Sequence, residues 1–259
     1  MARTGARDLA RALCLAAALC ALPGIGQAGP WARDKGGAFL SLSQEGGGAG
    51  TGWTSVYAEY GLTPRLTLGL DAGRGSSGDD QLHLFLQQAI LTGPGPNRLS
   101  LTMGAGLERR VDPASPDIAF GSLGLAWGRS LGTPLGPGWV AVEPQLRLGV
   151  EVTKDWPPTV LLTPDLKMTT ALTGRLDLTL GLHVTARTML IGQLRLDRGF
   201  ETGQGAAAGT TTPVAGSGGS VSATAVRRIA GPAHLSLGLA APLGEGGETA
   251  LRLGSWLQF

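Results

Sequence analysis

Apolar and polar residues alternate along most of the chain, and this period of two is its dominant pattern. Leucine occupies every second position from Leu66 to Leu70, with Thr67 and Gly69 between. Successive side chains of a β-strand point to opposite faces, so the alternation predicts strands with one apolar face. No helical stripe of comparable length occurs. The same period recurs over 99–107, 140–151, 176–185, 235–239 and 251–259.

Short turns and longer polar connections alternate between the predicted strands. The strands are predicted at 38–44, 53–60, 65–73, 81–91, 98–108, 118–128, 139–151, 160–172, 175–197, 218–229, 233–242 and 248–259. Tight turns are expected at 61–64, 93–97, 132–138, 173–174 and 230–232, and six longer loops at 45–52, 74–80, 109–117, 153–159, 199–217 and 244–247. This plan predicts an all-β fold, an antiparallel transmembrane β-barrel of about 12 strands, with both chain ends on the tight-turn side.

Two segments leave alternatives open. The predicted strand 175–197 is long, and it either projects beyond a membrane or breaks near Gly192. In the sixth strand, Ile118 and Phe120 are in one phase and the apolar residues of 123–127 are in the other. A β-bulge would reconcile the two phases, because one extra residue switches the face that follows it.

The first 28 residues have the pattern of a signal peptide. Three arginines precede an uncharged apolar run at 12–22, and a breaker region at 23–28 ends in a small residue. The run is too short for a membrane-spanning helix, which needs about 20 residues. We expect cleavage before Gly29, which leaves 29–259 as the barrel and implies export to the outer membrane.

Removal of this leader changes the chemistry expected of the mature chain. Both cysteines, Cys14 and Cys20, lie within it, so disulfides and thiolate metal sites are not expected. The leader holds three of the 21 basic and one of the 19 acidic residues, which leaves 18 of each. With a net charge near zero, nucleic acid is not an expected partner.

A sheet that spans lipid must close, because no backbone amide can remain unpaired there. Leucine-rich positions would face lipid, and polar-phase positions would face the lumen. Glu143 with Arg147, and Asp165 with Lys167, could brace the lumen or tune solute selectivity. The expected lumen-lining residues are Glu59, Asp71, His83, Glu143, Arg147, Asp165, Lys167, Asp177, His183, Arg187 and Arg252.

The chain ends on an aromatic residue preceded by in-phase leucines. Leu251, Leu253 and Leu257 share a face with Phe259. This ending resembles the terminal strand of outer-membrane proteins, and the resemblance implies recognition by the barrel-assembly machinery. Outer-membrane lipid and that machinery are therefore the expected partners.

Two segments near the start of the predicted barrel resemble a known group. They are Gly29-Pro30-Trp31, followed by Lys35-Gly36-Gly37, and the run 57–69, YAEYGLTPRLTLG. They are similar to poorly characterised proteobacterial barrels of the phenol-degradation MetA-pathway type, to which a transport role is ascribed. The resemblance implies an outer-membrane barrel with such a role, and it carries no site residues.

Candidate chemistry is sparse. The three histidines, His83, His183 and His234, fall in polar phases of different strands, and lumenal structural roles are favoured over metal or catalytic ones. No cofactor, metal site or catalytic residue is predicted, and no motif pairs a serine such as Ser122 with a histidine. The glycine-rich runs lack the Lys and Ser/Thr of a phosphate-binding loop.

Three functions follow from these observations. The leading hypothesis is a barrel with a narrow or partly plugged lumen that passes a small solute or serves passively, without enzymatic activity. Only about ten residues precede the first strand, so no fused plug domain is expected. The alternatives are an outer-membrane lipid-modifying hydrolase and a structural or adhesive surface protein that exposes 199–217.

Overall fold

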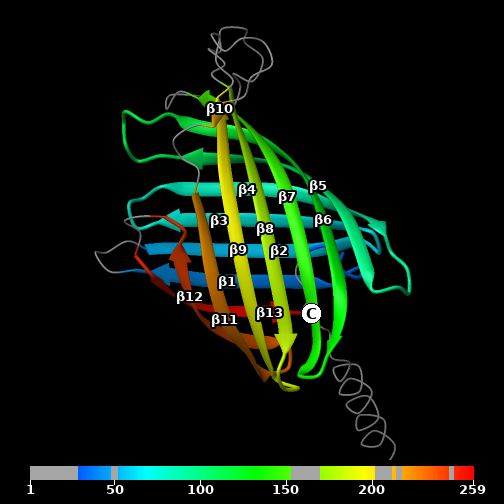
Figure 1. Cartoon of the computed structure of the whole chain (residues 1–259). Coiled ribbons are helices and arrows are strands. Elements are labelled where there is room, and N and C mark those ends of the chain that lie inside the picture. The colour runs from blue at the N-terminus through cyan, green and yellow to red at the C-terminus, as the bar shows by residue number, and fades with distance from the viewer. Residues whose placement is uncertain (1–28, 48–51, 153–169, 202–211, 214–217, 245–247) are drawn as a thin grey trace, which may run out of the picture.

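Twelve long antiparallel strands form a closed barrel in the computed structural model of the chain (Figure 1). The structure describes residues 29–47, 52–152, 170–201, 212–213, 218–244 and 248–259. The strands are β1 (Ala38–Gly46), β2 (Gly52–Thr63), β3 (Leu66–Gly75), β4 (Asp80–Leu91), β5 (Asn97–Arg109), β6 (Asp117–Thr133), β7 (Gly136–Val152), β8 (Thr170–His183), β9 (Thr188–Glu201), β11 (Gly218–Ala230), β12 (Ala233–Pro242) and β13 (Ala250–Gln258). A two-residue strand, β10 (Thr212–Pro213), pairs with the end of β9.

Each long strand pairs with its neighbours in the chain, and β13 pairs with β1 to close the ring. Five tight turns and Phe259 lie at one end of the barrel, which we call the turn end. The six longer connections lie at the other end, the loop end. The predicted fold, strand number and alternation of turns with loops are confirmed.

The prediction was wrong about where one hairpin turns. The segment 173–174, predicted as a turn, lies inside β8, and the predicted long strand 175–197 is divided by a turn at 184–187. Thr185 forms this turn without Gly or Pro: its backbone N–H and carbonyl both hydrogen-bond Thr188, and its Oγ1 accepts from the Arg187 N–H at 3.2 Å. Gly192 lies within β9 and causes no break.

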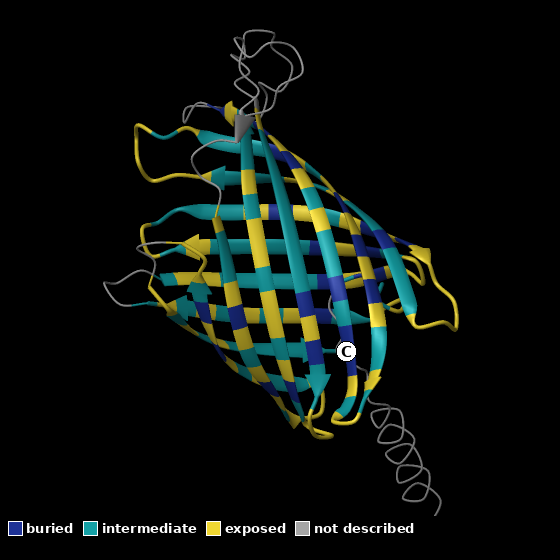
Figure 2. Cartoon of the chain, in the orientation of Figure 1, coloured by how far each residue is buried: buried dark blue, intermediate teal, exposed yellow. Residues whose placement is uncertain are grey.

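The outer face of the barrel is formed by leucines. Leu84, Leu123, Leu237 and Leu253 each expose about half of the side chain, whereas their chain neighbours point inward. Figure 2 shows this as exposed segments that alternate with buried or intermediate ones along each strand. Apolar side chains on the outside of a closed sheet are the arrangement of a transmembrane barrel.

Most of the described aromatic side chains lie inside the barrel, whereas Tyr60 and Trp127 are exposed. Phe120 faces inward, and the pairing of β5 with β6 runs without a register shift, so the bulge expected in the sixth strand is absent from it. The inward rings pack against glycines of neighbouring strands, where a Cβ would lie 2.0–2.4 Å from a ring atom. These pairs are Phe85 on Gly69, Trp53 on Gly73, Phe120 on Gly106 and Trp139 on Gly181.

Candidate functional site

The segment before β1 folds into the barrel at its turn end. Residues 29–35, which we call the strap, carry polar backbone groups that the wall satisfies. The Gln87 amide donates to the Gly29 carbonyl at 2.8 Å, and the Ser100 hydroxyl donates to the Pro30 carbonyl at 2.7 Å. Both Pro30 and Ser100 are fully buried. The strap is therefore packed inside the wall.

Two glycines make room for the strap. A Cβ on Gly61 would lie 2.0 Å from the Asp34 carbonyl oxygen, and a Cβ on Gly128 would lie 2.4 Å from Pro30 Cγ. Any larger residue at either position would displace the strap or the wall. The local sequence of β2 and β6 is thus matched to a chain that runs across the lumen.

A buried ion pair holds the middle of the strap. Arg33 Nε lies 2.5 Å from Glu59 Oε2, and the two side chains are only 10% and 3% exposed. The Tyr57 hydroxyl donates to the other oxygen of Glu59, and the Arg33 guanidinium lies 4.7 Å from the centre of the Phe39 ring. The Arg33 backbone N–H also donates to Thr67 Oγ1 at 3.0 Å. Glu59, a predicted lumen residue, therefore binds the strap and not a free solute.

The strap touches the wall on almost every side. Its partners above come from β2, β3, β4, β5 and β6, and Trp31 packs against the buried cluster of Trp139, Met189 and Val226 from β7, β9 and β11. Trp256 of β13 packs on the same cluster. The strap therefore lies inside the barrel at its turn end, in contact with most of the strands. Sequence reasoning did not predict that the residues before β1 lie inside the barrel.

Toward the loop end, a chamber of about 610 Å³ lies inside the barrel, with Gly29 among its lining residues. Its charged lining consists of four acids and four arginines: Glu45, Asp71, Glu143, Asp177, Arg147, Arg175, Arg195 and Arg252. The rest of the lining includes serine, threonine and glutamine side chains. The chamber is therefore polar, with balanced formal charge.

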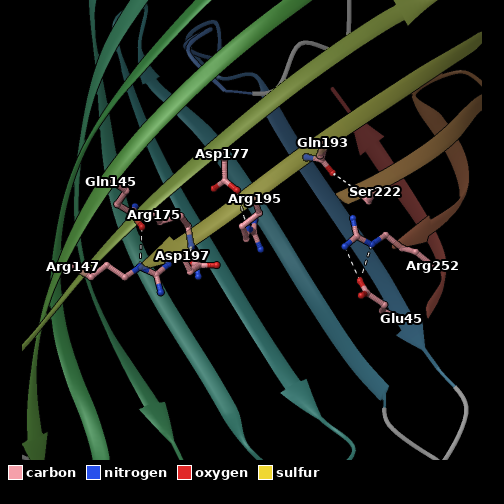
Figure 3. A network of polar contacts seen from close by, with 10 residues as sticks. All are labelled: Glu45, Gln145, Arg147, Arg175, Asp177, Gln193, Arg195, Asp197, Ser222 and Arg252. Carbon is pink, nitrogen blue, oxygen red and sulfur yellow. Dashed lines mark hydrogen bonds and ion pairs between the residues drawn. The ribbon is translucent and has the colours of Figure 1, made fainter. Parts of the chain in front are cut away.

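Most of these arginines are paired across neighbouring strands (Figure 3). In the β8–β9 hairpin, Arg175 lies opposite Asp197 and Asp177 lies opposite Arg195. The Nε-to-carboxylate distances are 2.6 Å and 2.7 Å. Directly opposed charges of unlike sign stabilise a strand pair. Among the described residues, opposite charges therefore brace the chamber wall between neighbouring strands.

A further pair joins the first and last strands. Arg252 of β13 lies opposite Glu45 of β1, and its Nε and Nη2 lie 2.9 Å and 2.7 Å from one Glu45 oxygen. Because β1 and β13 close the ring, this pair links the two chain ends on the chamber side (Figure 3).

The pairing expected of Arg147 is wrong. Arg147 does not contact Glu143. Its Nε donates to Gln145 at 2.8 Å, its Nη1 lies 3.6 Å from Glu108, and its guanidinium lies over the Phe120 ring. Residues four apart in one strand lie about 13 Å from each other, which is too far for a close pair.

His83 contacts a serine and two aromatic rings inside the barrel. Its Nε2 lies 2.8 Å from Ser122 Oγ, and its ring stacks between Phe85 and Phe120. Sequence reasoning could not find this contact, because 39 residues separate the partners. His183 packs against Trp139 at the turn end, and His234 contacts the carbonyl of Pro232. Among the described residues, no group of three or more His, Cys, Asp or Glu could hold a metal ion.

Three other predicted lumen residues are not found in the chamber lining that the structure describes. Arg187 lies exposed in the turn at 184–187, so it does not line the chamber, and the reason is the misplaced hairpin. Asp165 and Lys167 lie outside the described residues. Sequence reasoning missed Arg33, Glu45, Glu108, Arg175, Arg195 and Asp197. The correct position of the β8–β9 turn would have placed Arg195 opposite the predicted Asp177, and Arg175 opposite Asp197.

No helix in the described part of the chain is long and apolar enough to span a membrane. No protein-family model matches the sequence, and no curated protein shows significant similarity.

Solved structures with similar folds are outer-membrane proteins. The NanC porin aligns over 86% of this chain and 100% of its own, with a TM-score of 0.54 and 10% identity. The KdgM porin aligns over 85% of this chain and 99% of its own, with a TM-score of 0.47 and 9% identity. The outer-membrane phospholipase A from Escherichia coli aligns over 93% of this chain and 96% of its own, with a TM-score of 0.46 and 14% identity. The chain has the fold of an outer-membrane β-barrel. At this identity the likeness concerns fold and not activity.

Proposed function

We propose that the protein is a narrow outer-membrane channel for small polar solutes, closed at its turn end by the strap. The observation that carries this proposal is the polar chamber of about 610 Å³ inside a barrel with an apolar outer face. The sequence resemblance to barrels of the phenol-degradation MetA-pathway type also supports a transport role. The apolar outer face supports a location in the outer membrane.

The charge pattern of the chamber favours solutes without net charge. Four arginines and four acids line it, and Arg175, Arg195 and Arg252 already have carboxylate partners. A paired lining offers hydrogen bonds to both donors and acceptors without a strong field of one sign. Small neutral or zwitterionic solutes therefore fit it better than polyanions or polycations.

Liposome swelling tests this proposal. The barrel is tested without residues 29–34, so that the strap does not close its turn end. Proteoliposomes with this shortened barrel, placed in isotonic solutions of small sugars, zwitterionic amino acids, or charged solutes of similar size, should swell fastest with the uncharged and zwitterionic ones. In planar bilayers under a salt gradient, the reversal potential should lie near zero. Strong selectivity for one sign of ion, or no permeation of any small solute, would contradict the proposal. The second result would favour a passive or adhesive surface barrel.

A hydrolase is a second candidate, and the His83–Ser122 contact favours it. A serine hydroxyl 2.8 Å from an imidazole nitrogen is the core of an activated nucleophile. Two further parts of a serine hydrolase are missing among the described residues. No acid hydrogen-bonds His83, and the backbone of β6 around Ser122 is paired in the sheet on both sides.

A fluorophosphonate probe separates the two candidates. The hydrolase predicts covalent labelling of the folded protein that Ser122→Ala abolishes, together with release of fatty acid from phospholipid. The channel proposal predicts neither labelling at Ser122 nor lipid turnover, and unchanged solute permeation after Ser122→Ala.

A further inference from the structure

We propose that cleavage before Gly29 creates a ligand for the barrel itself: the new α-ammonium of Gly29 binds the carboxylate of Glu143 and locks the strap inside the lumen. The inference rests on the predicted cleavage site and not on the channel function. Hydrolysis breaks the bond between Ala28 and Gly29, and water supplies the hydroxyl of the new carboxyl group and a proton for the amine. A neutral amide nitrogen thereby becomes a cation at neutral pH.

The geometry brings this nitrogen to Glu143. A Cβ built on Gly29 would lie 3.0 Å from Glu143 Oε1 and 3.2 Å from Oε2. Since the nitrogen and that Cβ share one Cα, standard bond lengths place the nitrogen within about 5.5 Å of the same oxygen. Opposite charges at about 4–6 Å attract strongly in a partly buried site. The Gln87 bond to the Gly29 carbonyl fixes the position of this residue.

The arginines near Glu143 are paired with other carboxylates. Its neighbour across the β7–β8 pairing, Asp177, is bound by Arg195, and Glu59 is bound by Arg33. Glu143 makes no hydrogen bond or ion pair with any residue that the structure describes. A carboxylate enclosed by protein is costly unless it is paired. An ammonium at Gly29 supplies the missing charge, and only a chain that begins at this residue can supply it there.

The local sequence suits both the cleavage before Gly29 and the approach of Gly29 to Glu143. Gly26 and Ala28 place small residues at the third and first positions before the cleaved bond, as signal peptidases require. Gly29 has φ = 90°, a conformation that other residues rarely adopt, so the chain bends at the new terminus. The first residue of the mature chain is thus the one that reaches Glu143.

Amine acetylation of the folded outer-membrane protein tests the proposal. Intact mass establishes the start of the mature chain, and peptide mapping gives the acetylation rate of each amine before and after denaturation. Lys35 is exposed and serves as the internal standard. The Gly29 amine should react about tenfold more slowly in the folded protein than after denaturation, as expected of a modest ion pair, while Lys35 changes little.

Glu143→Gln and Asp71→Asn separate ion pairing from simple burial. Both residues line the chamber, and Asp71 likewise has no hydrogen bond or ion pair to a described residue. Glu143→Gln should remove most of the protection at Gly29, and Asp71→Asn should leave it unchanged, with heat-modifiable gel migration confirming folding of both. Three results would each overturn the proposal: a mature chain that starts elsewhere, an unprotected Gly29 amine, or equal effects of the two variants.

Discussion

Arg33→Met breaks the ion pair that holds the strap and retains an unbranched apolar stem in place of the charged side chain. Glu59 would remain 3% exposed and keep only the Tyr57 hydroxyl. Removal of one partner from a buried pair costs about 3–5 kcal/mol, because the other charge stays desolvated. Glu59 regains water if the strap leaves the lumen. The cost therefore falls on docking of the strap, and about 3 kcal/mol corresponds to a shift of about 10²-fold in that equilibrium.

Thiol labelling measures this shift. Residues 29–259 contain no cysteine, so Ala32→Cys places a single reporter in the strap. In protein refolded into lipid vesicles, Arg33→Met should raise the maleimide labelling rate by up to about 10²-fold. Adding Glu59→Gln to Arg33→Met should return the rate toward that of the parent, because the uncompensated charge is gone.

The matched control is Arg74→Met. Arg74 and Asp80 are 3.5 Å apart with side chains 72% and 41% exposed, and such surface pairs contribute little. Its labelling rate should equal that of the parent. An unchanged rate in folded Arg33→Met, or a double variant that labels as fast as the single one, would refute the role of this pair.

Four other changes probe the wall. Gly128→Ala places a methyl group 2.4 Å from Pro30, so the Ala32→Cys reporter should label faster than in the parent. Leu84→Arg puts a charge on the lipid face and should lower the unfolding free energy in vesicles by about 2–4 kcal/mol in a urea titration. Arg252→Gln removes the ion pair with Glu45 between β13 and β1 and should lower the unfolding free energy by about 1–2 kcal/mol. Deletion of Phe259 should reduce the folded protein in outer-membrane fractions, as gel shift would report.

Local alternation was sufficient to predict most of the strands and their faces. The sheet places one face on lipid and the other on the interior, so Leu237 and Leu253 point outward as their phase requires. Turn chemistry was less informative. Gly174 suggested a turn, yet it has no positive φ, while the real turn at 184–187 relies on hydrogen bonds of Thr185. Because the turn was predicted at 173–174 instead of 184–187, Arg187 was wrongly assigned to the lumen and the pairing of Arg195 with Asp177 was not predicted.

The strap and the His83–Ser122 contact could not be predicted from periodicity. The hydrogen bonds of the strap join residues 26 to 70 positions apart, and the pattern of a short segment does not indicate such distant partners. Phe120 was misread for a related reason. An apolar residue in the polar phase suggested a bulge, but its ring fills space beside His83 and over Gly106 inside the barrel.

Single-channel conductance of the barrel with and without residues 29–34 tests the central claim most directly, that the strap closes the turn end. The full barrel should show little or no conductance, and the shortened barrel should show stable openings several-fold larger. Equal conductance of two correctly folded barrels would contradict this account, because it would mean that the segment between Gly29 and Asp34 does not obstruct the lumen.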